Sequence, residues 1–320
     1  MTSPLVLITD CDHPDVAIER TRFTAAGLRV ALAQCRTADD VAVAGADASA
    51  LVTQYAPVTA QVLERLPQVR VVARYGAGLD NIDLEATASR SVRVVSVPDY
   101  SIEEVSNHAI ALTIAHVRGV VRLDRAVHEG HWDFRAAGPL ARASELCFGV
   151  VGLGRIGAAV AAKAQVLGFR VVGFDVSPRE LAGIVRLDLD SLCACSDVIS
   201  LHVPLSAETH HLFDHRRFAL MKRDALLVNT SRGSLVDRQA LLAALASGRL
   251  GGAALDVLEP EPPDVDDPLL RDPRVIITPH AAFYSEGSLE ELKRRVADGV
   301  VAALEESAFA GAAADSATAC

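Results

Sequence analysis

Apolar and polar positions along the chain fall into alternating blocks that predict strands and helices in turn. Short runs rich in Val, Ile, Leu and Ala predict strands at Leu5–Thr9, Arg29–Ala33, Ala48–Thr53 and Val69–Ala73. Segments with helical spacing lie between these runs, and the first of them, Val16–Ala26, stops at Gly27. This β-α-β-α order predicts a parallel, doubly wound sheet, which ends near Val97 and Pro98.

The same pattern then starts again and predicts a second parallel sheet. A helix is expected from about Ser101 to Val121, with Ser101 and Glu104 forming a capping box at its start. Strands are expected at Phe148–Gly152, Arg170–Phe174, Val198–Leu201, Ala225–Asn229, Gly252–Leu255 and Val275–Thr278. The segments between these strands have helical spacing, so this series also predicts an open α/β sheet.

The end of the chain carries one more helix and a tail. Ser288–Glu306 is amphipathic, and we expect it to pack back on the first sheet, because the second set of strands is complete before it. The segment from Ala308 to Cys320 is small, Ala-rich and polar, and we expect it to be disordered.

Composition and charge narrow the class of protein. Half of the 320 residues are apolar but only 4% are aromatic, which suits buried parallel strands covered by Ala-rich helices. A net charge of −10, from 31 basic and 41 acidic residues, disfavours nucleic acid as a direct partner. No apolar run reaches the length of a membrane span, and Met1–Ile8 lacks the basic residues of a signal peptide. The six cysteines have no zinc-site spacing, so we expect reduced thiols, no bound metal and a cytoplasmic location.

The residues from 152 to 157 form a glycine-rich motif with the pattern G-x-G-x-x-G. A predicted strand precedes the motif and a predicted helix follows it, as in a dinucleotide-binding β-α-β unit. Gly152 would permit the tight turn, Gly154 would let a pyrophosphate approach the backbone, and Gly157 would let the helix pack closely on the sheet. The N-terminus of that helix would meet the pyrophosphate with its free N–H groups.

Asp175 follows the second strand of this β-α-β unit. A carboxylate at this position can accept hydrogen bonds from the adenosine ribose and would repel a 2′-phosphate, which favours NAD over NADP. The alternative is a glycine-rich turn that binds no nucleotide. The presence of the strand, the helix and the acid together argues against that alternative.

Three polar residues lie just after predicted strands of the second sheet, namely Arg232, Glu261 and His280. Ligands of open α/β sheets bind at the carboxyl ends of the strands. Reduction of a ketone by hydride needs a proton donor, and histidine is suited to that role. A carboxylate beside the histidine would orient its ring, and an arginine can grip a substrate carboxylate with two hydrogen bonds. Each residue also has a simpler interpretation: a surface arginine after a turn, a solvated glutamate in an acidic loop, and a loop histidine bonded to the backbone.

Several segments together resemble the D-isomer-specific 2-hydroxyacid dehydrogenase family over almost the whole chain. The similarity is carried by the glycine-rich motif with Asp175 and by the segments Arg74–Asp83, His202–Leu205, Asn229–Gly233, Ala254–Val257 and Thr278–His280. The resemblance implies a catalytic trio of Arg232, Glu261 and His280. It also implies that the backbone N–H groups of Gly76, Ala77 and Gly78 hold the substrate carboxylate, beside Arg232 and Phe283.

The resemblance further implies a full set of cofactor contacts and an architecture. The expected NAD-binding residues are Gly152, Gly154, Arg155, Ile156, Gly157, Asp175, His202, Val203, Pro204, Thr209, Thr230, Ser231, Arg232, Asp256 and His280, with Asp256 at the nicotinamide carboxamide. The implied fold class is α/β: a flavodoxin-like substrate domain, residues 1–98 plus 287–320, and a Rossmann NAD-binding domain, residues 99–286, with a cleft between them. Family members are usually homodimers, joined through the NAD-binding domain with a contribution from the helix that begins near Ser101.

A closer similarity is to the branch that includes the C-terminal-binding proteins. The segments Val97–Val105 and His280–Glu286 carry this likeness. Two departures stand out: Phe283 replaces the tryptophan that those corepressors have, which implies a wider pocket, and Asn107 replaces an aspartate found in many relatives.

Two kinds of function follow from these observations. The first is an NAD-dependent enzyme that interconverts a 2-oxo acid and a (2R)-2-hydroxy acid. The second is an NADH-sensing, dimeric, corepressor-like binding protein, which would keep the same trio. The substrate side chain is not defined, because the candidate pocket residues fit no single acid; they are Gln54, Tyr55, Tyr75, Tyr100, Trp132 and Phe283.

Overall fold

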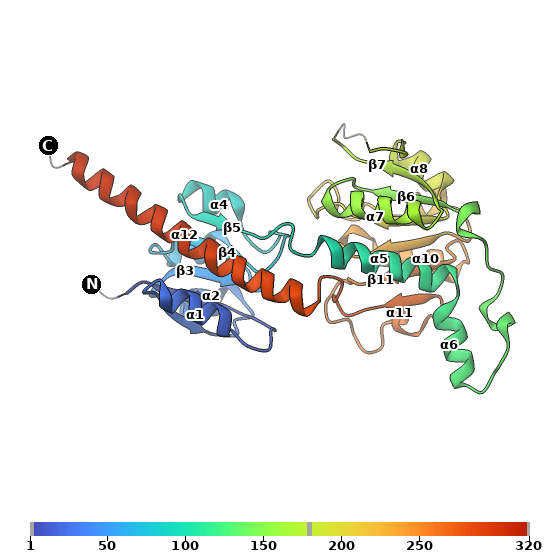
Figure 1. Ribbon diagram of the computed structural model, residues 1–320, viewed down its shortest axis with the longest axis horizontal. Helices are drawn as coiled ribbons and strands as arrows, with labels where there is room; N and C mark the ends of the chain where they lie inside the picture. Colours follow the sequence, from blue (N-terminus) through green and yellow to red (C-terminus); the bar gives the residue numbers. More distant parts are fainter. Residues whose placement is uncertain (1–2, 178–180, 319–320) are drawn as a thin grey trace. The chain divides into compact units, whose positions relative to one another are not determined.

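The computed structural model describes residues 3–177 and 181–318. The chain divides into two compact units, one formed by residues 1–100 with 285–320 and the other by residues 101–284 (Figure 1). Each division lies two residues from the one expected from the sequence. Among the described residues, no helix combines the length and apolarity needed to cross a membrane.

The first unit is built on a five-stranded parallel sheet with the order β2-β1-β3-β4-β5. Its strands are β1 (Leu5–Ile8), β2 (Arg29–Leu32), β3 (Ala48–Thr53), β4 (Val71–Arg74) and β5 (Arg93–Val95). Its helices are α1 (Ala17–Ala25), α2 (Ala38–Ala44), α3 (Ala60–Arg65), α4 (Leu84–Ser89) and α12 (Glu286–Thr318). Because the order reverses after β1, the carboxyl ends of β1 and β3 form a topological switch point.

Both faces of this sheet are buried, as expected for a parallel sheet. On one face, Val6 and Ile8 of β1 share a core with Phe23 of α1 and Val296 of α12. On the other face, Leu7 packs with residues of α2 and α3. The alternation of neighbouring side chains between two cores explains why the strands appear in the sequence as continuous apolar runs.

The tail expected to be disordered continues the last helix. α12 runs from Glu286 to Thr318, well beyond the expected end at Glu306. The side chains from Ala308 on, and residues 319–320 altogether, lie outside the described part of the chain, so the expectation of disorder there stays a prediction. Ala has the highest helix propensity, and a helix that has already formed extends more readily than a new one nucleates.

The second unit is a seven-stranded parallel sheet with the order β12-β11-β10-β9-β6-β7-β8. Its strands are β6 (Cys147–Val151), β7 (Arg170–Phe174), β8 (Val185–Arg186), β9 (Val198–Leu201), β10 (Leu226–Asn229), β11 (Gly252–Leu255) and β12 (Val275–Ile277). Its helices are α5 (Ile102–Val117), α6 (Val120–His128), α7 (Arg155–Val166), α8 (Leu189–Cys195), α9 (His215–Leu220), α10 (Arg238–Ala246) and α11 (Pro268–Arg271), with short 3-10 turns η1 (Phe134–Ala137), η2 (Ala143–Glu145) and η3 (Gly233–Leu235). One face packs against α5 and α7, and the other packs against α8, α9 and α10.

Two details of the helix predicted from Ser101 to Val121 were wrong. The helix is divided in two at Gly119, whose φ of +63° lies in the left-handed region. Ser101 does stand at the N-cap of α5, but its side chain makes no capping hydrogen bond, so the expected capping box is absent there. Ser101 is buried, and the local sequence pattern does not predict the burial of this residue.

Candidate active site

The glycine-rich loop joins β6 to α7 and has two glycines that packing requires. A Cβ on Gly152 would lie 2.5 Å from the carbonyl oxygen of His202, and a Cβ on Gly157 would overlap the carbonyl oxygen of Gly152. A Cβ on Gly154, by contrast, would meet nothing within 4 Å. Gly154 is also the N-cap of α7, so the open space lies at a helix N-terminus, where an anion is favoured.

Asp175 is fixed directly against this loop. Its Oδ2 accepts a hydrogen bond of 2.6 Å from the Leu153 N–H, and its Oδ1 accepts one of 2.7 Å from the Ser177 N–H. Arg186 of β8 donates to the backbone carbonyl of Asp175 at 2.7 Å. The carboxylate is therefore oriented, and a cation that the sequence pattern did not single out lies beside the same strand end.

Two buried polar atoms, just after β9 and just after β10, have no hydrogen-bond partner among the described residues. The Nε2 atom of His202, just after β9, lies 2.8 Å from the Ser200 hydroxyl, but its Nδ1 is buried without a hydrogen bond. The hydroxyl of Thr230, just after β10, is in the same state. Burial lowers the pKa of His202 to about 3, so its ring is neutral near pH 7. Unsatisfied buried polar groups are costly unless something pairs with them, so both atoms fit a site that holds a polar ligand.

Three further residues expected to line the cofactor lie on the segment that follows His202, namely Val203, Pro204 and Thr209. A Cγ atom of Val203 would lie 2.9 Å from a Cβ on Gly152, which places Val203 against the glycine-rich turn. Thr209 donates its hydroxyl hydrogen to the carbonyl of Pro204 at 2.7 Å and so closes the loop that follows β9. Arg155 and Ile156 form the first turn of α7.

His280 and Glu261 form a pair after β12 and β11. The Nδ1 atom of His280 lies 2.7 Å from Oε2 of Glu261, and Oε1 of Glu261 accepts a hydrogen bond of 2.8 Å from the Leu258 N–H. The two side chains are 27% and 32% exposed, so the pair is sheltered but reachable. The backbone of His280 has a φ of +52°, and its N–H donates to the Asp256 carbonyl at 2.7 Å.

Arg232, the third residue of the expected catalytic trio, lies just after β10. Its guanidinium donates to the Ser231 carbonyl at 2.8 Å. A Cβ on the next residue, Gly233, would overlap the Leu258 carbonyl, so the chain after Arg232 packs against the loop that carries Glu261. Burial of Glu261 opposes its ionisation, but the hydrogen bond and charge of His280, the Leu258 N–H and the charge of Arg232 outweigh that effect and lower the pKa of the Glu261 carboxyl.

Asp256 supports the loop on which His280 stands. Its side chain is 1% exposed, and its carboxylate accepts hydrogen bonds from the Thr278 hydroxyl at 2.5 Å and from the N–H groups of Ala281 and Ala282 at 2.9 Å each. His108 of α5 bonds the same Thr278 hydroxyl at 2.9 Å. His108 was not foreseen, because 170 residues separate it from Thr278.

Residues with substrate roles expected from the sequence are divided between the two units. The ring of Phe283 lies 6.4 Å from that of His280, edge to face. In the first unit, Gly76 has a φ of +132°, and the Arg74 guanidinium packs against its Cα, as shown by the overlap a Cβ would cause. Positive charge beside a glycine-rich turn suits an anion site.

The candidate pocket aromatics have very different settings. Tyr75 is buried, with its hydroxyl 2.8 Å from Glu19, so it does not line an open pocket. Tyr55 is 50% exposed and Trp132 is 90% exposed.

One group of side chains in the described part of the chain has the types and spacing of metal ligands. The ligand atoms of His210, His211 and Glu259 lie within 4.8 Å of one another. All three residues are exposed, and exposed groups of this kind are common without a metal, so we assign no ion to them.

Comparison with known proteins identifies the family. Residues 110–282 match the model of the D-isomer specific 2-hydroxyacid dehydrogenase, NAD binding domain. The chain is 40% identical over 253 residues to a glyoxylate reductase of Korarchaeum cryptofilum, with 77% of this chain and 76% of that protein covered. The chain belongs to the D-isomer specific 2-hydroxyacid dehydrogenase family. It is therefore an NAD-dependent oxidoreductase, as the sequence predicted.

Other members of the 2-hydroxyacid dehydrogenase family support the assignment. A D-3-phosphoglycerate dehydrogenase of Methanocaldococcus jannaschii is 37% identical over 250 residues, with 77% of this chain and 46% of that protein covered. The structure of a D-lactate dehydrogenase from Aquifex aeolicus with NAD and lactic acid superposes with a TM-score of 0.87 at 31% identity, covering 94% of this chain and 96% of that chain. The predicted fold class of two parallel-sheet α/β domains is thereby confirmed.

Proposed function

We propose that this dehydrogenase reduces a 2-oxo acid to a (2R)-2-hydroxy acid, with His280 as the acid/base, Glu261 as its orienting partner and Arg232 as the anchor of the substrate carboxylate. The single observation that carries the proposal is the 2.7 Å contact between His280 Nδ1 and Glu261 Oε2, with Arg232 close enough to lower the pKa of Glu261.

His280 has the chemistry that the reaction requires. When bound, NADH supplies a hydride to the carbonyl carbon, and the carbonyl oxygen must then gain one proton. With Nδ1 donating its hydrogen to Glu261, the Nε2 atom of His280 is the nitrogen that carries the transferable proton. In the reverse direction the same nitrogen accepts the hydroxyl proton.

Arg232 and the turn of Gly76, Ala77 and Gly78 are the proposed anchors of the substrate carboxylate. An arginine offers paired N–H donors, and a glycine-rich turn offers backbone N–H groups. We assign the turn to the first unit as the substrate domain and the glycine-rich loop at 152–157 to the second unit as the NAD-binding domain.

The cofactor assignment has support from the loop itself. The open space at Gly154, the N-terminus of α7 and the fixed carboxylate of Asp175 are what the pyrophosphate and ribose of NAD require. The unpartnered atoms of His202 and Thr230 are proposed to bond the cofactor, and Ser231 and Asp256 are proposed to line it. Asp256 would then serve two roles, because it already holds the His280 loop.

The substrate is proposed to be a small 2-oxo acid. By their names, the relatives act on glyoxylate, phosphoglycerate or lactate, so the family fixes the reaction type and leaves the side chain open. The alternative of an NADH-sensing corepressor-like protein rests on the two segments resembling the C-terminal-binding proteins. We place the enzyme first, because the glyoxylate reductase, the phosphoglycerate dehydrogenase and the lactate dehydrogenase all carry enzyme names.

The test is reduction of a panel of 2-oxo acids by NADH, followed by the loss of absorbance of NADH. We expect turnover with at least one acid and a loss of roughly 10³-fold or more in kcat for His280→Ala, with NADH binding retained. Wild-type protein that binds NADH but reduces no member of the panel would overturn the proposal and favour the binding-protein alternative.

We also propose a homodimer joined through the NAD-binding domain. α6, labelled in Figure 1, has no buried residue. The segment after it exposes Trp132 by 90% and Phe134 by 83%. Large apolar side chains gathered on one segment mark an interaction surface.

A further inference from the structure

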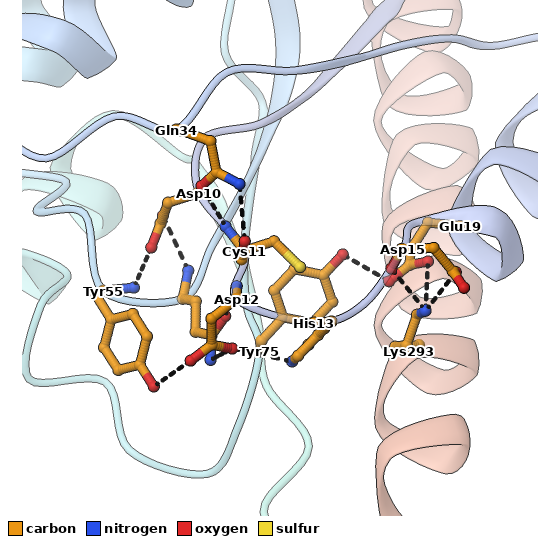
Figure 2. Close-up of polar contacts among 11 residues, drawn as sticks. Asp10, Cys11, Asp12, His13, Asp15, Glu19, Gln34, Tyr55, Tyr75 and Lys293 are labelled. Atoms are coloured by element: carbon orange, nitrogen blue, oxygen red, sulfur yellow. Dashed lines mark hydrogen bonds and ion pairs between the residues drawn. The ribbon is translucent and has the colours of Figure 1, made fainter. Parts of the chain in front are cut away.

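The carboxyl ends of β1 and β3 in the first unit carry a polar cluster that the proposed mechanism does not use. The cluster comprises Asp10, Asp12 and His13 after β1 and Tyr55 after β3 (Figure 2). Gln54, the residue before Tyr55, belongs to it as well. This edge is the switch point of the sheet, and in open α/β sheets ligands bind outside the carboxyl ends of the strands at such a point.

Asp10 is the structural member of the cluster. It is 6% exposed, and its carboxylate accepts hydrogen bonds from the N–H groups of Gln54 at 3.1 Å, Tyr55 at 2.6 Å and Ala56 at 3.2 Å. The Thr53 hydroxyl donates to it at 3.1 Å. With so many donors already in place, Asp10 fixes the turn after β3 and has little capacity for a ligand.

Asp12 is held differently and faces the solvent. Gln54 donates to its Oδ1 at 2.6 Å and the Tyr55 hydroxyl donates to its Oδ2 at 3.1 Å, yet its side chain is 59% exposed. The Asp12 N–H donates back to Gln54 at 3.0 Å. Tyr55 is half exposed, but the buried part of its side chain and the charge of Asp12 raise the pKa of the phenol, so its hydroxyl stays protonated as a donor. The result is a preoriented carboxylate with acceptor capacity left for one more donor.

His13 lies beside that carboxylate. Its side chain is only 3% exposed, and its Nε2 lies 4.0 Å from Oδ1 of Asp12, too far for a hydrogen bond. Neither ring nitrogen has a partner among the described residues. Burial lowers the pKa of the imidazole, so the ring is neutral and offers one donor and one acceptor. A hydroxyl group between the two side chains could donate to Asp12 and accept from His13.

The charge balance of the edge disfavours an anionic group. Lys293 of α12 lies 3.0 Å from the Asp15 carboxylate and 3.8 Å from that of Glu19, so it compensates those two acids (Figure 2). The two side chains that hold Asp12 are neutral. A phosphate or a second carboxylate placed beside Asp12 would be repelled by the negative charge of that carboxylate.

The cluster is continuous with the turn proposed to hold the substrate carboxylate. The His13 ring lies 4.8 Å from the ring of Tyr75, the residue before Gly76. We propose that Asp12 and His13 select the substrate side chain and favour a 2-oxo acid with a hydroxyl beside the ketone over acids that lack a hydroxyl or carry a second negative charge. This inference rests on the proposed function, which brings a 2-oxo acid to Gly76.

The test compares three probes with NADH: pyruvate, hydroxypyruvate and oxaloacetate. For the wild type we expect kcat/KM for hydroxypyruvate to exceed that for pyruvate by roughly 10-fold or more, with oxaloacetate lowest. Asp12→Asn removes the charge and keeps the shape. It should lower the hydroxypyruvate-to-pyruvate ratio of kcat/KM about 10-fold and raise the relative rate with oxaloacetate.

A control variant and a second variant of the cluster show whether a change in the ratios comes from this site. Asp39, whose side chain is 90% exposed on α2, serves as the control, and Asp39→Asn should change none of the ratios. His13→Phe keeps a planar ring and should reduce the hydroxypyruvate preference in the same direction as Asp12→Asn. A wild type that reduces pyruvate as well as hydroxypyruvate, or unchanged ratios in Asp12→Asn, would overturn this inference and leave the proposed function standing. Failure with all three probes and with the wider panel would overturn both.

Discussion

Glu261 and His280 are 19 residues apart in the chain, and their side chains meet at 2.7 Å between Oε2 and Nδ1. The contact depends on two different strand ends, because Glu261 follows β11 and His280 follows β12, which are neighbours in the sheet. The loop of Glu261 packs on Gly233 and the loop of His280 is bonded to Asp256. The pair is thus held by backbone packing on both sides rather than by its own hydrogen bond alone.

Removing the charge of Glu261 should slow the chemical step. Glu261→Gln keeps the shape but loses the carboxylate that pairs with Nδ1 of His280 and orients its ring, so kcat should fall roughly 10- to 100-fold with NADH affinity unchanged. Steady-state kinetics and NADH fluorescence titration measure the two quantities. Glu259→Gln, an exposed neighbour two residues away, is the control and should be nearly silent. Equal rates for Glu261→Gln and wild type would remove Glu261 from the mechanism.

Substitutions of two glycines in the loop at 152–157 should have different effects: one should lower the stability of the fold and the other should lower NADH affinity. Gly157→Ala forces an overlap with the Gly152 carbonyl and should lower the free energy of unfolding by several kcal/mol, roughly 3 or more. Gly154→Ala meets open space, so the protein should keep its stability while NADH affinity falls, because the new methyl group occupies the proposed pyrophosphate position. Urea unfolding and NADH titration of both variants decide the point; a Gly154→Ala protein with wild-type affinity would contradict it.

Asp175 should control the choice between NAD and NADP. Its carboxylate is held by the Leu153 and Ser177 N–H groups, so its negative charge has a fixed position at the strand end. Asp175→Ala should reduce the preference for NADH over NADPH by about 10-fold or more, since repulsion of the 2′-phosphate is lost and Arg186 stays nearby. The ratio of kcat/KM with the two cofactors is the measurement. A wild type that already prefers NADPH would refute this role for Asp175.

His116 should make the second unit sensitive to acid. Burial, followed by the charge of Arg122, lowers the pKa of His116 from its ordinary value of 6.5 to about 4. Between these values the unfolded chain binds the proton and the folded chain does not, so the free energy of unfolding should fall as the pH drops from about 6.5 toward 4.

This loss amounts to about 2 kcal/mol at pH 5 for His116 alone. His116→Gln cannot titrate, so the difference in unfolding free energy between pH 7.5 and pH 5 should shrink by that amount, measured by urea unfolding. His128→Gln, with a side chain 78% exposed, is the control. An unchanged pH difference in His116→Gln would show that His116 contributes nothing to acid sensitivity.

Trp132 and Phe134 should be needed for the proposed dimer. Replacing both with serine removes the two most exposed aromatic side chains after α6 and should shift the protein toward a monomer at micromolar concentration. Light scattering during gel filtration reports the mass. Val43→Ser, at a position 69% exposed in the first unit, is the control. A double variant with the mass of the wild type would place the interface elsewhere.

The strands were predictable because both faces of each sheet are buried. Runs such as Ala48–Thr53 and Val198–Leu201 carry no polar alternation, and the structure reproduces both to the residue. β8, Val185–Arg186, was not predicted, because a two-residue edge strand that is exposed leaves no apolar signal. The break at Gly119 was also missed, since one glycine inside an apolar periodic segment is compatible with a continuous helix.

Residues after strands could be proposed for the site because parallel strands bring their carboxyl ends together. That logic pointed to Arg232, Glu261 and His280. The same logic did not give Asp12 and His13, although they too follow a strand. The partners of Asp12, Gln54 and Tyr55, lie more than forty positions away in the chain and pair with it through side chains. His108 was equally hidden, as a histidine on an apolar helix carries no sign of its distant partner.

α12 has a consequence for how this chain is made. The first unit encloses Phe23 with Leu292, Val296 and Val300 of α12, and Lys293 donates to the Asp15 carbonyl at 2.8 Å. During synthesis, all of residues 101–284 leave the ribosome after the first part of this unit and before α12. The first unit therefore lacks one side of its core until α12 has been synthesised, and a product truncated before Leu292 would leave that apolar face exposed.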